Sequence, residues 1–511
     1  MAGIDIICFS TPRIVPSVEC MTASTFTRHL GLLFPDTLPF SGYFAPVRIE
    51  ADIYDLEVDG EIPADLNGAF YRNGADAQYP PMLGDDIYLN GDGMVTMLRF
   101  HDGHADLRSR FVRTERFLAE RKARRSLSGA YRNPFTDEAG LAGIGAGTAN
   151  TSVYWHGGKL LALKEADQPY ELDPMTLETR GKYDFDGQLT SATFTAHPKT
   201  DPVTGDLIAF AYNTRGRPDR DVAIYVISPG GEIVREEWFE APYPSMMHDY
   251  LVSQDYIIFH ISPMIADWER LKAGVPFFQW DPSHESMVGV IPRRQGVSGI
   301  RWFSSPTVMQ THTINAFNTA DQLTIDHFVA ASGWLSQFPD ANGIITKEEP
   351  PIAQRWTFDL TSADDSFTAT TLVNLPGDMP RVDPRRLTQP NRHMWMGALN
   401  RDLGPMVELG PMGPPFNCLV HLDHQTGVRQ YFYPGPDNAP EEPVFVPRPG
   451  STTEGDGYLI SVVGRRRENR SDVVILDPLR LDDGPLATIK IPYRLRYAFH
   501  GTWAPAEELP W

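Results

Sequence analysis

One pattern recurs along most of this chain: a short run of β-branched or aromatic residues, a turn rich in Gly, Asp or Asn, and a second such run. Antiparallel hairpins are the structure that this pattern predicts. Strands at this spacing from about residue 50 onward are too many for one sandwich, so the sequence predicts an all-β fold and favours a β-propeller. Clear instances of the pattern are residues 152–165, 193–213, 221–239, 247–261 and 418–433.

Composition supports this fold and excludes some functions. The 511 residues include 42 Gly and 44 Pro, a combined share above the usual level of about 12%, which suits a chain with many turns. The net charge is −21, and a charge of this sign repels the phosphate backbone of nucleic acids. The basic run at 121–125 is too short to reverse that repulsion, so we expect no nucleic-acid partner.

Cysteine usage and hydropathy indicate the compartment. Cys8, Cys20 and Cys418 follow neither a disulfide nor a thiolate-metal spacing, so we expect a reducing, cytoplasmic environment. No apolar run reaches the length of about 18 residues that a membrane helix requires, so we expect no stable membrane insertion. Residues 1–40 are expected to form a leader, partly disordered or extended, with Met21 as an alternative start. Residues 41–511 are expected to form one propeller domain, and a homodimer is compatible with this sequence.

One long interruption of the strand pattern is predicted around residues 263–297. In its first part Ile265, Trp268 and Leu271 share a helical stripe, and Gly274 suits the C-terminal end of a helix. Aromatic residues follow at 277–280. A helical cap over one face of the propeller is the interpretation that fits best, with the aromatic side chains either covering a pocket for a flat ligand or only packing the cap in place.

Four of the fourteen histidines stand at the start or end of predicted strands: His197, His248, His312 and His500. Their sequence separations match no local metal motif, and a single histidine is more often an ordinary core or surface residue. The innermost strands of a propeller converge on one axis, so residues far apart in sequence can meet there. Four imidazoles at the axis would suit a borderline transition metal. The remaining histidines, such as His260, His284 and His393, are interpreted as structural.

These histidines lie in motifs by which the chain resembles the carotenoid cleavage oxygenases, from about Tyr54 to Trp503. The resemblance implies a seven-bladed β-propeller with a helical or loop dome over its active-site face. It also implies that His197, His248, His312 and His500 hold a non-haem Fe(II), with dioxygen as co-substrate. Neutral ligands leave the ion its full charge and leave positions open for dioxygen. The motifs are FYRNG (70–74), GDGM (91–94), ANT (149–151), LALKE (161–165), AHPK (196–199), MHDY (247–250), HTINAF (312–317), EPVFVPRPG (442–450), EGDGYLISVV (454–463) and FHGTW (499–503).

The same resemblance implies residues around the metal. Ligating histidines generally give their other ring N–H to a carboxylate, and Glu165 and Glu454 fit this role by motif. The third carboxylate of the family is usually a Glu, and Asp378 in DMPR stands in the corresponding place. Thr151, in ANT, resembles the residue whose methyl group restricts one open position of the iron.

A lysine in the LALKE motif points to the substrate. If Glu165 faces the metal, Lys164 must lie near the cavity, and a buried cation is costly unless it meets a polar group. A polyene offers no such group, whereas a phenol does. Tyr131 matches the tyrosine that partners this lysine in the lignostilbene- and resveratrol-cleaving dioxygenases, the branch of the family that the chain resembles most.

We therefore expect an enzyme that cleaves the central C=C bond of 4-hydroxystilbenes with dioxygen to give two aromatic aldehydes. Lys164 and Tyr131 would hold the phenol and favour its phenolate, which pushes electron density toward the vinyl carbon. Two alternatives stay open: cleavage of a carotenoid or apocarotenoid, and a non-catalytic propeller scaffold. Against a membrane-dipping carotenoid enzyme, the predicted cap helix is charged at Asp267, Glu269, Arg270 and Lys272.

Overall fold

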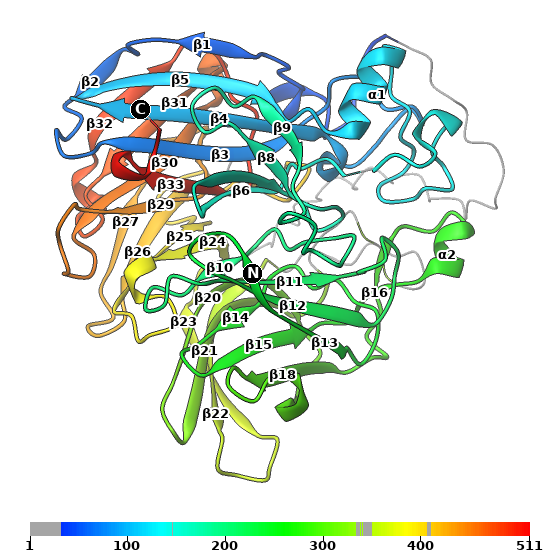
Figure 1. Cartoon of the computed structure of the whole chain (residues 1–511). Coiled ribbons are helices and arrows are strands. Elements are labelled where there is room, and N and C mark those ends of the chain that lie inside the picture. The colour runs from blue at the N-terminus through cyan, green and yellow to red at the C-terminus, as the bar shows by residue number, and fades with distance from the viewer. Residues whose placement is uncertain are drawn as a thin grey trace, which may run out of the picture.

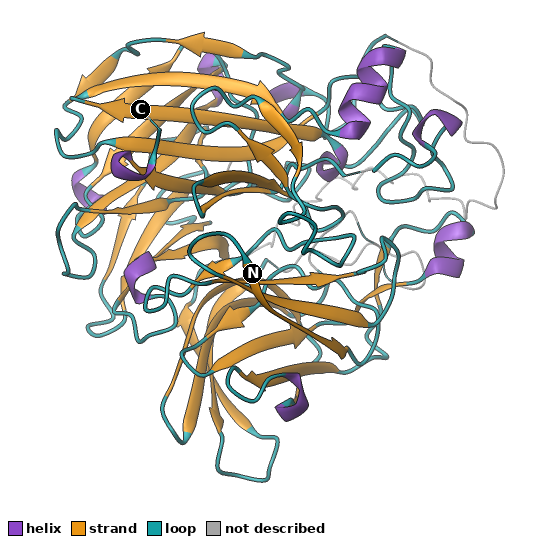
Figure 2. Ribbon diagram, viewed as in Figure 1, coloured by secondary structure: helices purple, strands orange, loops and turns teal. Residues whose placement is uncertain are grey.

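The strands assemble into seven sheets of four to six strands, together with one two-stranded sheet. The computed structural model describes residues 32–145, 147–333, 338, 340, 350–405 and 410–510. In these residues strands dominate and helices are few and short (Figure 2). The seven sheets are the blades of a propeller, so the predicted all-β, seven-bladed architecture is confirmed.

The blades succeed one another around the ring, and the strands of each blade run in order from the axis outward. Blade 1 consists of β33 (Gly501–Pro505), β3 (Gly68–Asp76), β4 (Asp92–His101), β5 (His104–Phe111) and β1 (Ala51–Ile53). Blade 2 consists of β6 (Ser152–His156), β7 (Lys159–Leu163), β8 (Tyr170–Leu172) and β9 (Thr179–Lys182). Blade 3 consists of β10 (Lys199–Thr200), β11 (Leu207–Tyr212), β12 (Asp221–Ile227) and β13 (Ile233–Glu240).

The remaining blades follow in chain order. Blade 4 consists of β14 (Leu251–Val252), β15 (Tyr256–Ile261), β18 (Ser286–Pro292) and β19 (Arg301–Ser305). Blade 5 consists of β20 (Met309–Asn318), β21 (Gln322–Ala330), β22 (Ile352–Asp359) and β23 (Phe367–Val373). Blade 6 consists of β24 (Gly377–Val382), β25 (His393–Ala398), β26 (Cys418–Asp423) and β27 (Arg429–Phe432). Blade 7 consists of β28 (Asn438–Pro440) and β29 (Val444–Pro447), which both pair with β30 (Gly457–Arg465), then β31 (Arg470–Leu476), β32 (Pro485–Ile491) and β2 (Val58–Gly60).

The innermost strands contact one another around the axis. Strand β33 packs beside β6, β14 beside β20, β20 beside β24, and β29 beside both β24 and β33. Residues of these strands are therefore neighbours in space although they are far apart in the sequence.

Alternation of side chains along each strand builds the core between blades. In β11, Leu207, Ala209 and Ala211 pack toward blade 2, whereas Ile208 and Phe210 pack toward blade 4. Both faces of a blade are buried against a neighbour, so the strands are apolar almost continuously instead of alternating with polar residues. Seven buried clusters of this kind fill the seven spaces between adjacent blades.

The ring closes where the two ends of the chain pair. Strand β33 at the C-terminal end pairs with β3 near the N-terminal end, with Phe70 opposite Trp503. In blade 7 the N-terminal strand β2 completes the outer edge by pairing with β32. Two blades thus combine strands from both ends of the chain, and this pairing closes the ring.

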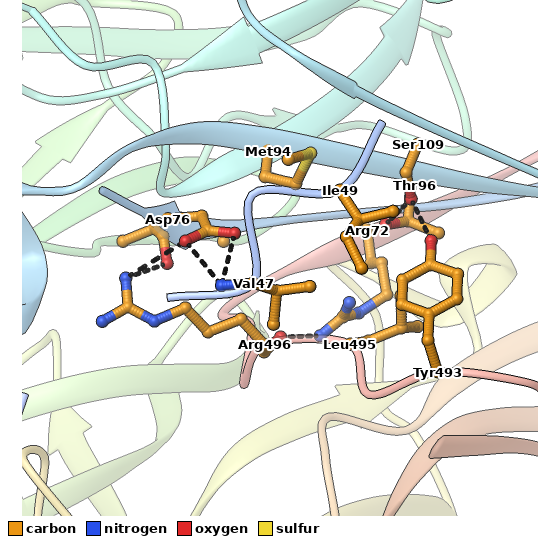
Figure 3. A pocket seen from close by; sticks show the side chains of 12 residues that line it. Val47, Ile49, Arg72, Asp76, Met94, Thr96, Ser109, Tyr493, Leu495 and Arg496 are labelled. Carbon is orange, nitrogen blue, oxygen red and sulfur yellow. Dashed lines mark hydrogen bonds and ion pairs between the residues drawn. The ribbon is translucent and has the colours of Figure 1, made fainter. Parts of the chain in front are cut away.

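Buried charges reinforce this closure (Figure 3). The Asp76 carboxylate accepts hydrogen bonds from the backbone N–H groups of Val47 and Arg48, at 3.2 and 2.7 Å, and Arg496 lies 3.9 Å away. Arg72 donates to the carbonyl of Arg496 at 2.8 Å and to the Glu441 carboxylate at 2.5 Å. The N-terminal segment is therefore fastened to the C-terminal segment by groups that water hardly reaches.

A dome lies over one face of the ring. Figure 1 shows the helices α1 (Glu115–Ala123) and α2 (Trp268–Lys272) on the same side of the molecule, beyond the ends of the blades. Strands β16 (Met264–Ala266) and β17 (Phe278–Trp280) flank α2 and pair with each other. In the residues described, no helix is long and apolar enough to cross a membrane.

Two sequence predictions about this region need correction. The insertion ends before Ser286, not at residue 297, because β18 begins there and belongs to blade 4. The predicted helix is shorter than expected, because Ile265 lies in β16 and pairs with Gln279 instead of starting a helical stripe. Most of the predicted leader lies outside the described residues, and residues 32–40 contain no strand.

The Arg72–Glu441 pair makes ring closure testable. Arg72→Met should leave Glu441 buried without its partner and lower the free energy of unfolding by about 3–5 kcal/mol, measured by urea denaturation. Arg113→Met is the matched control, because Arg113 pairs with Glu50 near the surface, where such a pair is worth about 0–1 kcal/mol. Equal losses in the two variants would contradict a special role for the buried pair.

Candidate metal centre

Four histidines meet at the propeller axis. His197 lies two residues before β10, His248 lies just before β14, His312 lies within β20, and His500 immediately precedes β33. Each therefore belongs to the innermost strand, or to its approach, in a different blade. The structure brings together all four histidines that the sequence singled out.

The ring nitrogens of the cluster converge on one point. The Nε2 atoms of His197 and His248 are 3.1 Å apart, those of His248 and His312 are 3.0 Å apart, and those of His312 and His500 are 3.2 Å apart. One ligand atom from each of the four lies within 4.8 Å of the others. Nitrogen ligands at right angles and about 2.1 Å from a common ion are separated by about 3.0 Å, so the spacing suits a single metal ion.

Carboxylates orient three of the histidines. Glu165 follows β7 and accepts a hydrogen bond from His248 Nδ1. Asp378 in β24 accepts one from His312 Nδ1 at 2.9 Å. Glu442, just before β29, accepts one from His500 Nδ1 at 2.8 Å.

These hydrogen bonds fix the tautomer of three of the four rings, those of His248, His312 and His500. A proton held at Nδ1 leaves a lone pair on Nε2. The Nε2 lone pairs of neighbouring histidines therefore face one another at close range. Such an arrangement is repulsive unless a cation lies between them, which is the chemistry of a metal site. Burial, together with the other three imidazoles, holds the pKa of His197 well below its usual value and so keeps it neutral.

Two of these carboxylates, Glu165 and Glu442, stay ionised. Burial alone would raise the pKa of Glu165, but the neighbouring His248 and hydrogen bonds from His248 and Tyr212 lower it to about 2. At Glu442 burial would likewise raise the pKa, but the neighbouring Arg381 and His500 lower it to about 2. The cluster thus offers imidazole nitrogens beside two ionised carboxylates, which is a suitable environment for a cation.

The structure contradicts the assignment of Glu454. Its carboxylate accepts hydrogen bonds from the backbone N–H groups of Arg392 and His393, at 2.6 and 2.9 Å, and it lies 3.7 Å from Arg386. Glu442 has the role that the sequence assigned to Glu454, since it accepts the hydrogen bond from His500. Its position in the sequence could have indicated this role. Glu442 leads into an innermost strand, as the clustered histidines do, whereas Glu454 lies in the turn after that strand.

Thr151 and the other histidines also have defined places. The Thr151 carbonyl accepts a hydrogen bond from the backbone N–H of His500 at 3.3 Å, which puts Thr151 beside the cluster. His260 is buried away from the four, beside His327 and Trp356, and burial lowers its pKa to about 3. His284 lies at the surface near Asp281.

Lys164 and Tyr131 form a second feature, which we call the phenol pocket. The Lys164 ammonium lies 5.4 Å from the centre of the Tyr131 ring and donates to Asn150 Oδ1 at 3.0 Å and to the Leu89 carbonyl at 3.3 Å. An ammonium has three donors, so one remains for a ligand. Burial lowers the pKa of Lys164 to about 7 and raises that of Tyr131 to about 12.

An apolar cavity of about 570 Å³ opens on another side of the axis, and we call it the distal cavity. Asp378 and Phe499, the neighbours of two cluster histidines, form part of its wall, and Leu399 forms another part. Lys164 belongs to blade 2 and Asp378 to blade 6, which are nearly opposite in a ring of seven. The metal centre therefore lies between a cationic pocket and an aromatic-lined cavity.

Comparison with known proteins agrees with this architecture. The model of the retinal pigment epithelial membrane protein (RPE65) family matches residues 44–505, so the chain belongs to this family. It is 44% identical to lignostilbene-alpha,beta-dioxygenase isozyme III of Sphingomonas paucimobilis, over 93% of this chain and 99% of that protein. It is also 44% identical to isoeugenol monooxygenase of Pseudomonas nitroreducens, over 91% of this chain and 97% of that protein. The crystal structure of Pseudomonas brassicacearum lignostilbene dioxygenase superposes with a TM-score of 0.89 at 42% identity, covering 93% of this chain and 100% of that one.

A comparison of Glu442, which contacts His500, with Glu454, to which the sequence assigned that role, tests the metal centre. Glu442→Gln should reduce iron affinity by about 10–100-fold, because an orienting carboxylate of a ligating histidine is lost. Glu454→Gln should leave iron affinity unchanged. Iron content after dialysis against a chelator measures both.

Single substitutions of the cluster complete this test. His197→Ala, His248→Ala, His312→Ala and His500→Ala should each lower bound iron, whereas His284→Ala should not. Full iron content in any of the four variants would remove that residue from the centre.

Proposed function

We propose that this protein is an Fe(II)-dependent dioxygenase that cleaves the central C=C bond of 4-hydroxystilbenes. One molecule of dioxygen is consumed, and its two oxygen atoms end in two aromatic aldehydes. The observation that carries the proposal is Lys164: a buried lysine with a pKa near neutrality, facing Tyr131 beside the metal centre. A buried amine of this kind suits a ligand that brings an acidic hydroxyl group.

His197, His248, His312 and His500 would hold the iron, and Thr151 would stand beside it. When bound there, Fe(II) supplies the site at which dioxygen binds and becomes reactive. The donor set fits this ion, since the four imidazoles would ligate it, while Glu165, Asp378 and Glu442 would hold three of the ligating rings from outside.

The residues of the phenol pocket prepare the substrate. In its neutral form Lys164 accepts the proton of the 4-hydroxyl group, and the resulting ammonium and the Tyr131 hydroxyl donate to the phenolate oxygen. The phenolate then delocalises electron density through the ring toward the para-vinyl carbon, which makes the double bond more reactive toward an electrophilic oxidant. The hydroxyl group is therefore both the point of attachment and the source of activation.

The distal cavity favours a substrate with a second ring. A stilbene anchored by its phenol on the blade 2 side carries its other ring across the axis, toward the blade 6 side. The cavity there is aromatic and apolar, which suits an aryl group. Asp378 Oδ2 is buried without a hydrogen-bond partner among the described residues and borders this cavity, so it suits a hydroxyl on the distal ring.

A second candidate is cleavage of a propenylphenol, because one relative of 44% identity is an isoeugenol monooxygenase. Such a substrate shares the phenol and the vinyl carbon, and it would use Lys164 and Tyr131 equally. It carries only a methyl group where a stilbene has a ring, and that group would fill little of the distal cavity. Carotenoid cleavage is less favoured, since a polyene offers no partner for Lys164.

Lys164→Met tests the phenolate step. The variant keeps the apolar stem but loses the amine, so it should bind iron normally and lose most cleavage of 4-hydroxystilbenes, measured by aldehyde formation. Tyr131→Phe should have a similar or smaller effect, and the two losses should be non-additive if both groups act on one oxygen. Wild-type protein should leave 4-methoxystilbenes uncut.

The pH profile gives an independent readout. Because the neutral amine of Lys164 accepts the proton, kcat/KM of the wild type should rise with pH through about 7, the pKa that burial gives this group. The rise at this pH should be missing from the residual activity of Lys164→Met. A variant as active as wild type, or equal turnover of hydroxy and methoxy substrates, would contradict the phenolate mechanism.

Leu399→Trp separates the two candidate substrates. The larger side chain would occupy part of the distal cavity, and overpacking of about 1–3 kcal/mol corresponds to roughly a ten- to hundredfold loss of kcat/KM for a 4-hydroxystilbene. Isoeugenol turnover should change little, since its methyl group does not reach far into that space. Equal losses for both substrates would mean that the distal cavity does not receive the second ring.

A further inference from the structure

Arg132, the residue after Tyr131, has an unusual backbone conformation. Its φ angle is 53°, in the left-handed region, which non-glycine residues seldom adopt. Conformations of this kind cost about 1–3 kcal/mol and persist only where the surroundings hold them. The turn places Tyr131 and Arg132 side by side at the phenol pocket.

Aromatic rings from two parts of the molecule hold the Arg132 side chain. Its guanidinium carbon lies 4.3 Å from the centre of the Phe277 ring and 5.3 Å from that of Phe278, both in the dome. It lies 5.9 Å from the ring of Tyr212, in β11 of blade 3. A planar guanidinium stacked in this way has little freedom to move.

The charge of Arg132 acts on the groups around the phenol pocket. It interacts with the hydroxyl groups of Tyr131 and Tyr212 and with the Glu165 carboxylate. Among the described residues, its Nη1 atom is buried and has no hydrogen-bond partner. A buried donor without an acceptor costs about 1–3 kcal/mol, so this N–H is available to a ligand that brings an anionic oxygen.

On the basis of the proposed function, we propose that Arg132 is a positioning residue whose fixed positive charge stabilises the substrate phenolate. The proton transfer breaks the phenol O–H bond and forms an N–H bond on Lys164, so a neutral pair becomes an ammonium and a phenolate. Separating charges in a buried pocket is unfavourable unless further charge lies close by. Arg132 provides that charge before the substrate arrives, without reorganisation.

The other charged groups facing Lys164 are already engaged. Glu165 accepts from His248 and Tyr212. Arg116 approaches Lys164 from helix α1, but it donates to Asn90 at 2.9 Å and lies 3.6 Å from Glu120. Arg116 Nε also lacks a hydrogen-bond partner among the described residues, but it lies 3.6 Å from the Glu120 carboxylate, whereas Arg132 Nη1 has no carboxylate within ion-pair distance among these residues. Arg132 is therefore the neighbouring cation that is better placed to serve the substrate, and its charge also disfavours the ammonium form of Lys164 before the phenol binds.

The test uses the iron-loaded protein under anaerobic conditions with 4-hydroxy-4′-nitrostilbene, whose phenolate absorbs at longer wavelength than the phenol. Without dioxygen no turnover occurs, so absorbance reports the ionisation of the bound probe. In wild type the probe should ionise at a lower pH than in solution. In Arg132→Gln and Arg132→Met the midpoint should rise by about one pH unit, the usual effect of losing one nearby opposite charge, and Arg132→Lys should restore part of the shift.

Arg121→Met is the matched control, because the Arg121 guanidinium stacks on Phe117 at 4.8 Å, outside the phenol pocket, and its loss should leave the midpoint unchanged. Circular dichroism and iron content confirm that each variant is folded and loaded. A wild-type midpoint in folded Arg132→Gln would overturn the inference and leave the proposed function intact. A wild type that cleaves no 4-hydroxystilbene would overturn the proposed function itself.

Discussion

Closure of the ring is the constraint on which the rest of the structure depends. Strand β33 returns to pair with β3, and only this pairing places His500 at the axis beside three histidines from blades 3, 4 and 5. The closure is made of backbone hydrogen bonds and of buried groups such as Arg72 and Asp76, which tie the N-terminal segment to the C-terminal one. A metal centre built from residues about 300 positions apart therefore requires a fully assembled fold.

The metal centre is a polar site at the axis of a fold whose blades are packed mainly by apolar side chains. Each blade buries both faces and packs them mostly with apolar side chains, whereas histidines and carboxylates gather at the axis. At the axis, carboxylates from blades 2, 6 and 7 hold protons on the outer nitrogens of histidines in other blades. The resulting hydrogen bonds cross from blade to blade, and the site is rigid because the surrounding blades pack tightly against one another.

Electrostatics also distinguishes the two sides of the metal centre. On the blade 2 side, Lys164, Tyr131 and Arg132 lie close together, with burial lowering the pKa of the lysine to about 7. On the blade 6 side the distal cavity is apolar, and among the residues that the structure describes Asp378 Oδ2 is an acceptor on its border without a partner. An elongated substrate with a phenol at one end and an aryl ring at the other matches this asymmetry, whereas a uniform polyene would leave the cationic side unmatched.

The sequence alone determined the strand pattern, the four histidines and the pair Lys164 and Tyr131. Strand periodicity and turn residues act locally, so the order of residues is enough to predict blades, and the family motifs supplied the rest. The sequence does not show which residues lie close together in space. Glu442 and Glu454 lie at opposite ends of β29, a strand of four residues that spans about 13 Å, so only one of them reaches His500, and only the folded blade shows which.

The same limit applies to the dome and to Arg132. Ile265 fits a helical stripe by spacing, but pairing with Gln279 makes it part of a strand, because a tertiary partner outweighs a weak local preference. Nothing in the sequence distinguishes Arg132 from the arginines that lie at the surface. Its place follows from a left-handed turn and from the rings of Phe277 and Tyr212, which come from the dome and from blade 3. The sequence thus identified most of the candidate site residues. The tertiary structure decided which of them meet, because charge interactions and hydrogen bonds depend on separations that only the closed ring sets.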